Sequence, residues 1–230
     1  DDLRKFHREY YFPANIVVAA AGRLNHKEIA GLVEKKFRKL TKNNSRSFLK
    51  ARNSQENPKV KFFRKDIEQM HLALGVFGLE RDHKDKHAFN LLNIILGGNM
   101  SSRLFDEVRE KRGLAYSIGS AGHALKDTGL FMIRAGVDNQ KIVEAVRVIL
   151  LELGKIKRNP VTKSEFTRAK DYYIGQIVLD LEDTLDHMSW IGSSTITLDK
   201  TRTLEDVLRE VKKVSIIDIK RAANAILKEK

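Results

Sequence analysis

The first 40 residues contain two segments with apolar residues at helical spacing and one apolar run between them. Residues 1–12 carry the first helical pattern, which ends before Pro13. The run NIVVAAAG, residues 15–22, predicts a buried strand that ends in a glycine turn. Asn25 is a good helix N-cap, and residues 26–40 place their apolar side chains on one face. This stretch is therefore predicted to be helix–strand–helix.

The next segment has no hydrophobic periodicity. Residues 41–58, TKNNSRSFLKARNSQENP, are rich in Asn, Ser and basic side chains, which is typical of an extended linker. No other stretch is an obvious internal boundary. We therefore divide the chain into residues 1–40, the linker 41–58 and a larger domain over 59–230.

Strand patterns open this larger domain. KVKFFRKD, residues 59–66, and QMHLALGVFG, residues 69–78, each suit a strand. KHAFNLLNIIL, residues 86–96, has a helical apolar face, and Gly97 and Gly98 end that helix.

A short charged helix and a hairpin come next. SSRLFDEVREKRG is predicted to be a helix capped by Ser101 or Ser102 and ended by Gly113. LAYSIGSAGHAL, residues 114–125, and GLFMIRAGV, residues 129–137, are predicted strands joined by a tight turn.

The rest of the chain is helical in pattern. Thr162 and Glu165 form a capping box at the start of a long helix, and two amphipathic helices follow near 203–213 and 215–228. Hairpin-linked strands followed by helices predict an α+β fold, with an antiparallel-rich sheet covered on one face by helices. We also predict that residues 15–21 complete the sheet formed within 59–136.

Composition narrows the class of protein without naming a function. The hydrophobic fraction of 42% suffices for a buried core, and the charged fraction of 32% suits a well-solvated surface. No apolar run has the length of a membrane-spanning helix. With no cysteine, disulfides and thiolate metal sites are excluded, and the count is compatible with either redox compartment. No signal peptide is visible, but the first residue is Asp rather than Met.

The net charge of +13 raises the possibility of nucleic-acid binding. The basic residues are spread along the chain and interleaved with acids, which favours a solvated lysine-rich surface. No nucleic-acid-binding motif accompanies them. We expect no nucleic-acid partner; steep salt-dependent binding to DNA would be the contrary observation.

The histidines do not form a metal motif. His83 and His87 lie four residues apart, but Lys86 stands where the zinc motif H-x-x-E-H has its glutamate. We interpret these two as solvated histidines at a helix end, and His71 and His123 as sheet residues. The sequence also lacks a phosphate-binding P-loop and a Gly-x-Ser-x-Gly nucleophile motif.

Arg109 and Tyr116 are the candidate catalytic residues. A left-handed Gly113 would reverse the chain between them and bring the strand back toward the helix. Arginine supplies a forked set of N–H donors and tyrosine a phenol donor, so together they suit a substrate carbonyl or the oxyanion formed from it. The alternative is a surface ion pair for the arginine and a plain strand position for the tyrosine.

The segment LLNIILGGNMSSRLFDEVREKRGLAYSI, residues 91–118, closely resembles a motif of the zinc peptidase superfamily that contains insulysin, pitrilysin and the mitochondrial processing peptidases. Residues 2–22 resemble the segment that closes the first half-domain of those proteins. Residues 69–89 resemble the start of the second half-domain, and 165–184 its long later helix. The resemblance covers nearly the whole chain.

The resemblance implies a clamshell peptidase that encloses peptides between two halves. Zinc is held in one domain by H-x-x-E-H and a distant Glu, while an Arg and a Tyr seven residues apart reach across from the other. Arg109 and Tyr116 match that pair. We expect Gly97, Gly98 and Asn99 to contact substrate, with Asn99 replacing the third glycine of the family motif.

The sequence departs from the family because H-x-x-E-H is absent. We therefore expect no metal site here and an inactive chain by itself. The leading hypothesis is the non-zinc domain of a zinc metalloendopeptidase, acting with a zinc-bearing half-domain in cis or trans, as a homo- or hetero-dimer. The alternative is a catalytically silent scaffold subunit. The localisation of the protein stays unknown. Because the motif is of the bacterial type, we expect the bacterial cytoplasm or the periplasm.

Overall fold

The computed structural model describes residues 1–40 and 48–228. The chain divides into two compact units. Unit 1 comprises Asp1–Lys50 and Gly175–Val207, and unit 2 comprises Ala51–Ile174 and Leu208–Lys230. Every candidate site residue lies in unit 2.

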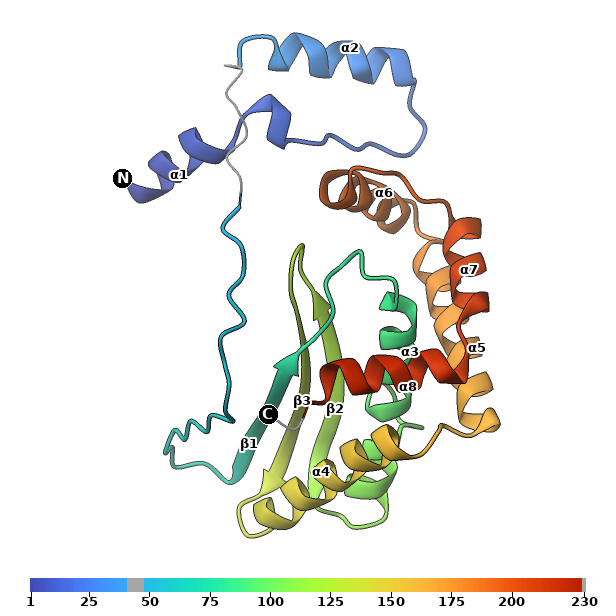
Figure 1. Cartoon of the computed structure of the whole chain (residues 1–230). Coiled ribbons are helices and arrows are strands. Elements are labelled where there is room, and N and C mark those ends of the chain that lie inside the picture. Colours follow the sequence, from blue (N-terminus) through green and yellow to red (C-terminus); the bar gives the residue numbers. More distant parts are fainter. Residues whose placement is uncertain (41–47, 229–230) are drawn as a thin grey trace. The chain divides into compact units, whose positions relative to one another are not determined.

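Unit 2 is built on an antiparallel sheet of three strands in the order β1-β3-β2 (Figure 1). The strands are β1 (Gln69–Phe77), β2 (Ala115–Ala124) and β3 (Gly129–Asp138). The central strand β3 carries the most buried side chains because it has a neighbour on both edges. β2 and β3 form the hairpin expected from the sequence, closed by a hydrogen bond from the Leu125 N–H to the Thr128 carbonyl (2.8 Å).

Helices cover one face of this sheet. The inward side chains of β3, Phe131, Ile133, Ala135 and Val137, pack in one core with α3 (Lys86–Leu96), α4 (Ile142–Arg158) and α8 (Ile216–Ile226). Along β1, exposed side chains alternate with half-buried ones, so the opposite face stays open to solvent. The predicted α+β architecture is confirmed.

Side-chain ties hold the helices of unit 2 in place. Arg221 of α8 makes a two-pronged ion pair with the buried Asp85, which precedes α3. The predicted capping box is present at the start of α5 (Lys163–Asp180), where the Thr162 hydroxyl accepts from the Glu165 N–H (3.2 Å) and the Glu165 carboxylate accepts from the Thr162 N–H (2.9 Å).

Unit 1 contains α1 (Asp2–Tyr10), the short 3₁₀ helix η1 (Pro13–Asn15), α2 (His26–Phe37) and α6 (Thr184–Leu198), and α7 (Leu204–Lys213) begins in it. The Asn25 side chain caps α2 as expected, accepting from the Lys27 N–H (2.9 Å). Neither α1 nor α2 has a buried residue. The amphipathic helices predicted near the end of the chain are present as α7 and α8.

Two predicted strands are absent. Residues 16–22 are irregular and belong to unit 1, and they do not join the sheet of unit 2. Residues 59–66 are also irregular, with Phe62 and Phe63 exposed. Both predictions were wrong for this chain because a strand needs a hydrogen-bonded neighbour as well as apolar side chains, and within the described part of the chain neither segment has one. Residues 48–58 carry no helix or strand, and the rest of the predicted linker, 41–47, lies outside the described residues.

Candidate functional site

The loop after α3 is held tightly against β2 at Gly97. The Gly97 carbonyl accepts a hydrogen bond from the Ser120 N–H (2.9 Å). A Cβ at this position would lie 2.7 Å from both the amide nitrogen and the hydroxyl oxygen of Ser120. Gly97 is therefore required for close packing of the helix end on the strand, a role that sequence reasoning did not assign to it.

Asn99 organises the turn that follows. Its side-chain oxygen accepts from the Ser101 N–H (2.9 Å), and its carbonyl accepts from the Ser102 hydroxyl (2.5 Å). The expectation that Ser101 or Ser102 caps the next helix was wrong, since Ser102 is buried and donates backward, and no side chain caps that helix. Gly98 is exposed. Substrate contact by Gly97, Gly98 and Asn99 stays a prediction.

The next segment is a π-helix rather than an ordinary short α-helix. It spans Phe105–Glu110 as η2, and the Lys111 N–H donates to the Asp106 carbonyl five residues back (2.9 Å). Such wide turns are rare and occur often at functional sites. Gly113 follows with φ of 55°, and its N–H donates to the Arg109 carbonyl (3.0 Å). The predicted left-handed chain reversal is confirmed.

Arg109 projects from η2 with its guanidinium over an aromatic ring. The guanidinium carbon lies 4.7 Å from the centre of the Phe105 ring. The nearest acid is Glu110, whose Oε1 is 3.9 Å from the Arg109 Nε. The side chain is 43% exposed, so its charge is accessible to a ligand.

The other acids of η2 are already paired. The Lys111 ammonium lies 2.7 Å from carboxylate oxygens of both Asp106 and Glu107, and Arg112 pairs with Glu107 as well. Hydrogen bonds from Lys111 and Arg112 lower the pKa of Glu107 to about 2. Hydrogen bonds to the carboxylates of Asp106 and Glu107 raise the pKa of the Lys111 ammonium above its usual value. The carboxylates of Asp106 and Glu107 therefore do not neutralise Arg109.

Tyr116 sits at a β-bulge. Ala115 pairs with Val137 and Ser117 with Gly136, so Tyr116 is the extra residue of β2. Bulges re-aim a side chain and interrupt regular pairing. Tyr116 is 76% exposed, and its hydroxyl makes no hydrogen bond within residues 1–40 and 48–228. A phenol that is both exposed and unpaired is available to a ligand.

Buried side chains support the segment that carries Arg109 and Tyr116. η2 packs directly on β2, with Val108 of η2 and Leu114 and Ala115 at the start of the strand buried in the core. No hydrogen bond joins Arg109 to Tyr116 within the described part of the chain. The structure thus presents two exposed donors on adjoining elements, while their joint action on a substrate stays a prediction.

A partly buried polar cluster in unit 2 was missed by sequence reasoning. The His87 Nε2 is 3.0 Å from the Glu210 carboxylate and its Nδ1 is 3.2 Å from the Tyr173 hydroxyl, which also accepts from the Asn90 amide (2.6 Å). The interpretation of His87 as solvated was wrong, since it is buried. Its partners lie 86 and 123 residues away in sequence, so no local pattern could have revealed them. His71 and His123 lie in β1 and β2, on the exposed face of the sheet.

Comparison with known proteins agrees with these observations. The family described as "Peptidase M16 inactive domain" matches residues 1–173, three quarters of the chain. The chain belongs to the peptidase M16 family. The resemblance to zinc peptidases seen in the sequence is thereby confirmed.

Relatives of this M16 domain are named zinc proteases. One from Streptomyces coelicolor, described as uncharacterized, is 35% identical over 99% of this chain and 51% of its own length, and YmxG of Bacillus subtilis is 32% identical over 100% of this chain and 55% of its own. The chain thus spans about half the length of these relatives.

Solved structures show the same fold. A Helicobacter pylori protease superposes with a TM-score of 0.88 at 26% identity, covering 99% of this chain and 56% of that one. A peptidase M16 inactive domain from Pseudomonas fluorescens gives a TM-score of 0.83 at 25% identity, covering 98% and 54%.

The residues of this M16 domain that the structure describes do not fit a zinc ion. H-x-x-E-H is absent from the sequence. Within residues 1–40 and 48–228 there is no group of three or more His, Asp or Glu side chains that could hold a metal.

In the same part of the chain, no helix is both long and apolar enough to cross a membrane.

Proposed function

We propose that this chain is the substrate-binding, transition-state-stabilising domain of a zinc metalloendopeptidase. The observation that carries the proposal is the state of Arg109, which is exposed and set over an aromatic ring, and whose nearest carboxylate, that of Glu110, lies 3.9 Å away and beyond hydrogen-bond distance. The exposed phenol of Tyr116 at the adjoining bulge supports it. Membership in a family whose relatives are named zinc proteases supplies the class of reaction.

The two side chains suit the charge that develops during peptide hydrolysis. When water attacks a peptide carbonyl, the carbonyl carbon becomes tetrahedral and its oxygen gains negative charge. The N–H groups of Arg109 and the O–H group of Tyr116 are available as hydrogen-bond donors in the free domain. They bind a negatively charged oxygen more strongly than the oxygen of a neutral carbonyl. The domain therefore lowers the barrier without supplying the nucleophile.

A second part of the proposal concerns the other half of the enzyme. Residues 1–40 carry exposed large apolar side chains, among them Leu3, Phe6, Val18 and Leu32, and their two helices have no buried residue. This pattern fits a segment that packs on a further domain, in line with the share of the relatives that this chain spans. That domain is the zinc-bearing half, and substrate peptides lie between the two halves.

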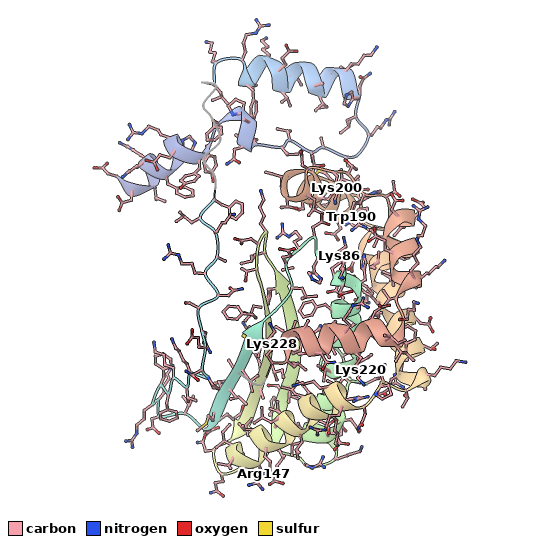
Figure 2. The ribbon with its side chains drawn as sticks, in the orientation of Figure 1. Lys86, Arg147, Trp190, Lys200, Lys220 and Lys228 are labelled. Atoms are coloured by element: carbon pink, nitrogen blue, oxygen red, sulfur yellow. The ribbon has the colours of Figure 1, made fainter. Side chains whose placement is uncertain are left out.

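The test is hydrolysis of a quenched fluorescent peptide by the protein combined with its zinc-bearing half. We expect Arg109→Ala to lower kcat/KM by roughly 10²–10³, the loss typical of one oxyanion donor. Tyr116→Phe keeps the ring and removes the hydroxyl, so it isolates the donor from packing. Arg147→Ala on α4 removes an exposed arginine outside the site and should leave the rate unchanged (Figure 2).

Full activity of Arg109→Ala and Tyr116→Phe with zinc present would contradict the proposed roles. Absence of hydrolysis in every combination, with both side chains intact, would favour the scaffold alternative.

A further inference from the structure

We propose that Phe105 is a positioning residue that holds the Arg109 guanidinium in its working orientation through a cation–π contact. The inference rests on the proposed function of Arg109. It assigns to the ring a role beyond packing: keeping the cation fixed while leaving its donors unoccupied.

The geometry of η2 brings the two side chains together. Phe105 and Arg109 are four residues apart, so they lie on the same helical face one turn apart. The guanidinium carbon lies over the Phe105 ring, 4.7 Å from its centre, well inside the range of about 6 Å for a cation–π contact. Phe105 is half-buried and is flanked along the helix by the buried Leu104 and Val108, which fix the backbone that carries the ring.

A ring suits this task better than a carboxylate. The positive charge of arginine is spread over a plane, and its N–H donors lie around the edge of that plane. An aromatic ring attracts the face of the plane, so the edge stays available to a substrate oxygen. A carboxylate would instead occupy the donors and cancel the charge. At 3.9 Å from the Nε, Glu110 is too distant for a hydrogen bond.

The ion pairs of Asp106 and Glu107 also help to leave the Arg109 donors available. Lys111 and Arg112 hold Asp106 and Glu107, so these carboxylates do not compete with the ring for Arg109. Without the ring, an exposed arginine would sample many rotamers, and each substrate would have to bear the cost of ordering it. Phe105 therefore pre-organises the donor.

The first test is a double-mutant cycle in the reconstituted peptidase. We expect Phe105→Leu to lower kcat/KM roughly 3- to 30-fold when Arg109 is present, from the usual strength of such contacts, and to cause no further loss when Arg109 is already alanine. Phe105→Tyr keeps an aromatic face and should restore most of the rate. Phe63→Leu is the matched control, because Phe63 also lies beneath a cation, with the Lys61 ammonium 4.8 Å from its ring centre, but precedes β1. It should leave the rate unchanged.

The second test needs no activity. In this chain, the nuclear magnetic resonance signals of the Arg109 side chain should be displaced upfield by the Phe105 ring current. Phe105→Leu should remove that displacement, and Phe105→Tyr should retain it. Arg109 signals that are the same in wild type and Phe105→Leu would overturn the proposal, as would an equal loss of activity from Phe105→Leu with and without Arg109. If Arg109→Ala has no effect on hydrolysis while the displacement is present, the proposed function fails and the positioning contact stands.

Discussion

Glu165 shows how a single side chain can join two elements. Its carboxylate accepts from the Arg103 Nε (2.7 Å) and Nη2 (3.0 Å) just before η2, and from Thr162 at the start of α5. Burial by itself would raise the pKa of Glu165, but the Arg103 guanidinium and the Thr162 donors outweigh it and hold the pKa at about 2. The charged form is therefore favoured in the folded protein relative to the unfolded chain.

This shift makes part of the folding stability dependent on pH. Because the folded pKa lies below the unfolded value, the stabilisation is present above pH ~4.5 and is lost as pH falls toward about 2. We expect that loss to be roughly 2–3 kcal/mol for Glu165. Glu165→Gln should have a lower free energy of unfolding at pH 7 and a shallower decline between pH 5 and pH 2, measured by urea denaturation.

The control for this measurement is Glu68→Gln, which changes an exposed glutamate before β1. It should reproduce the wild-type decline. Glu107, whose pKa is also about 2, accounts for part of the decline that Glu165→Gln retains. A decline as steep in Glu165→Gln as in wild type would show that the Arg103 contact does not form.

At the scale of elements, the junction between α3 and β2 depends on one missing side chain. A Cβ at Gly97 would meet backbone as well as side-chain atoms of Ser120 at 2.7 Å, so helix and strand would have to move apart. We expect Gly97→Ala to lower the free energy of unfolding by about 2–3 kcal/mol, as overpacking does. Gly175→Ala in α5 is the matched control, since a Cβ there has open space and should add up to about 1 kcal/mol.

Denaturation of both glycine variants distinguishes packing from substrate contact. If Gly97→Ala were as stable as Gly175→Ala but impaired peptide hydrolysis, the close packing would be refuted and the substrate-contact prediction supported. Gly98, which is exposed, would then be the next position to substitute.

The elements themselves were largely predictable because their signals are local. The apolar helical face of residues 86–96, the hairpin of β2 and β3, the Asn25 cap and the Thr162–Glu165 capping box each depend on residues close in sequence. The π-helical turn of η2 and the bulge at Tyr116 were not predictable. Both depend on how η2 and β2 pack on the core, and an apolar pattern is the same for an α-turn and a π-turn.

At the scale of the whole molecule, α1 and α2 are α-helices with no buried residue. Segments that bury little open easily, because little free energy opposes their unfolding. We expect the amides of Asp2–Tyr10 and His26–Phe37 to exchange with deuterium quickly in this chain, and those of β3, which lies between two strands, to exchange slowest.

Adding the zinc-bearing half should slow exchange in α1 and α2 by at least about tenfold, with little change in β3. Hydrogen exchange measured by mass spectrometry follows all three elements in one experiment. Equal exchange with and without that half would contradict the proposal that residues 1–40 pack against it.

Residue order by itself determined the α+β class, most helix boundaries, the left-handed turn at Gly113 and the family, because each rests on short-range spacing or on a contiguous motif. It also singled out Arg109 and Tyr116. Only the tertiary structure decided that residues 16–22 and 59–66 find no strand partner among the described residues, that His87 is buried between Tyr173 and Glu210, and that the Phe105 ring lies against the Arg109 guanidinium. Those outcomes depend on contacts between residues that folding brings together, and a local sequence pattern does not encode such contacts.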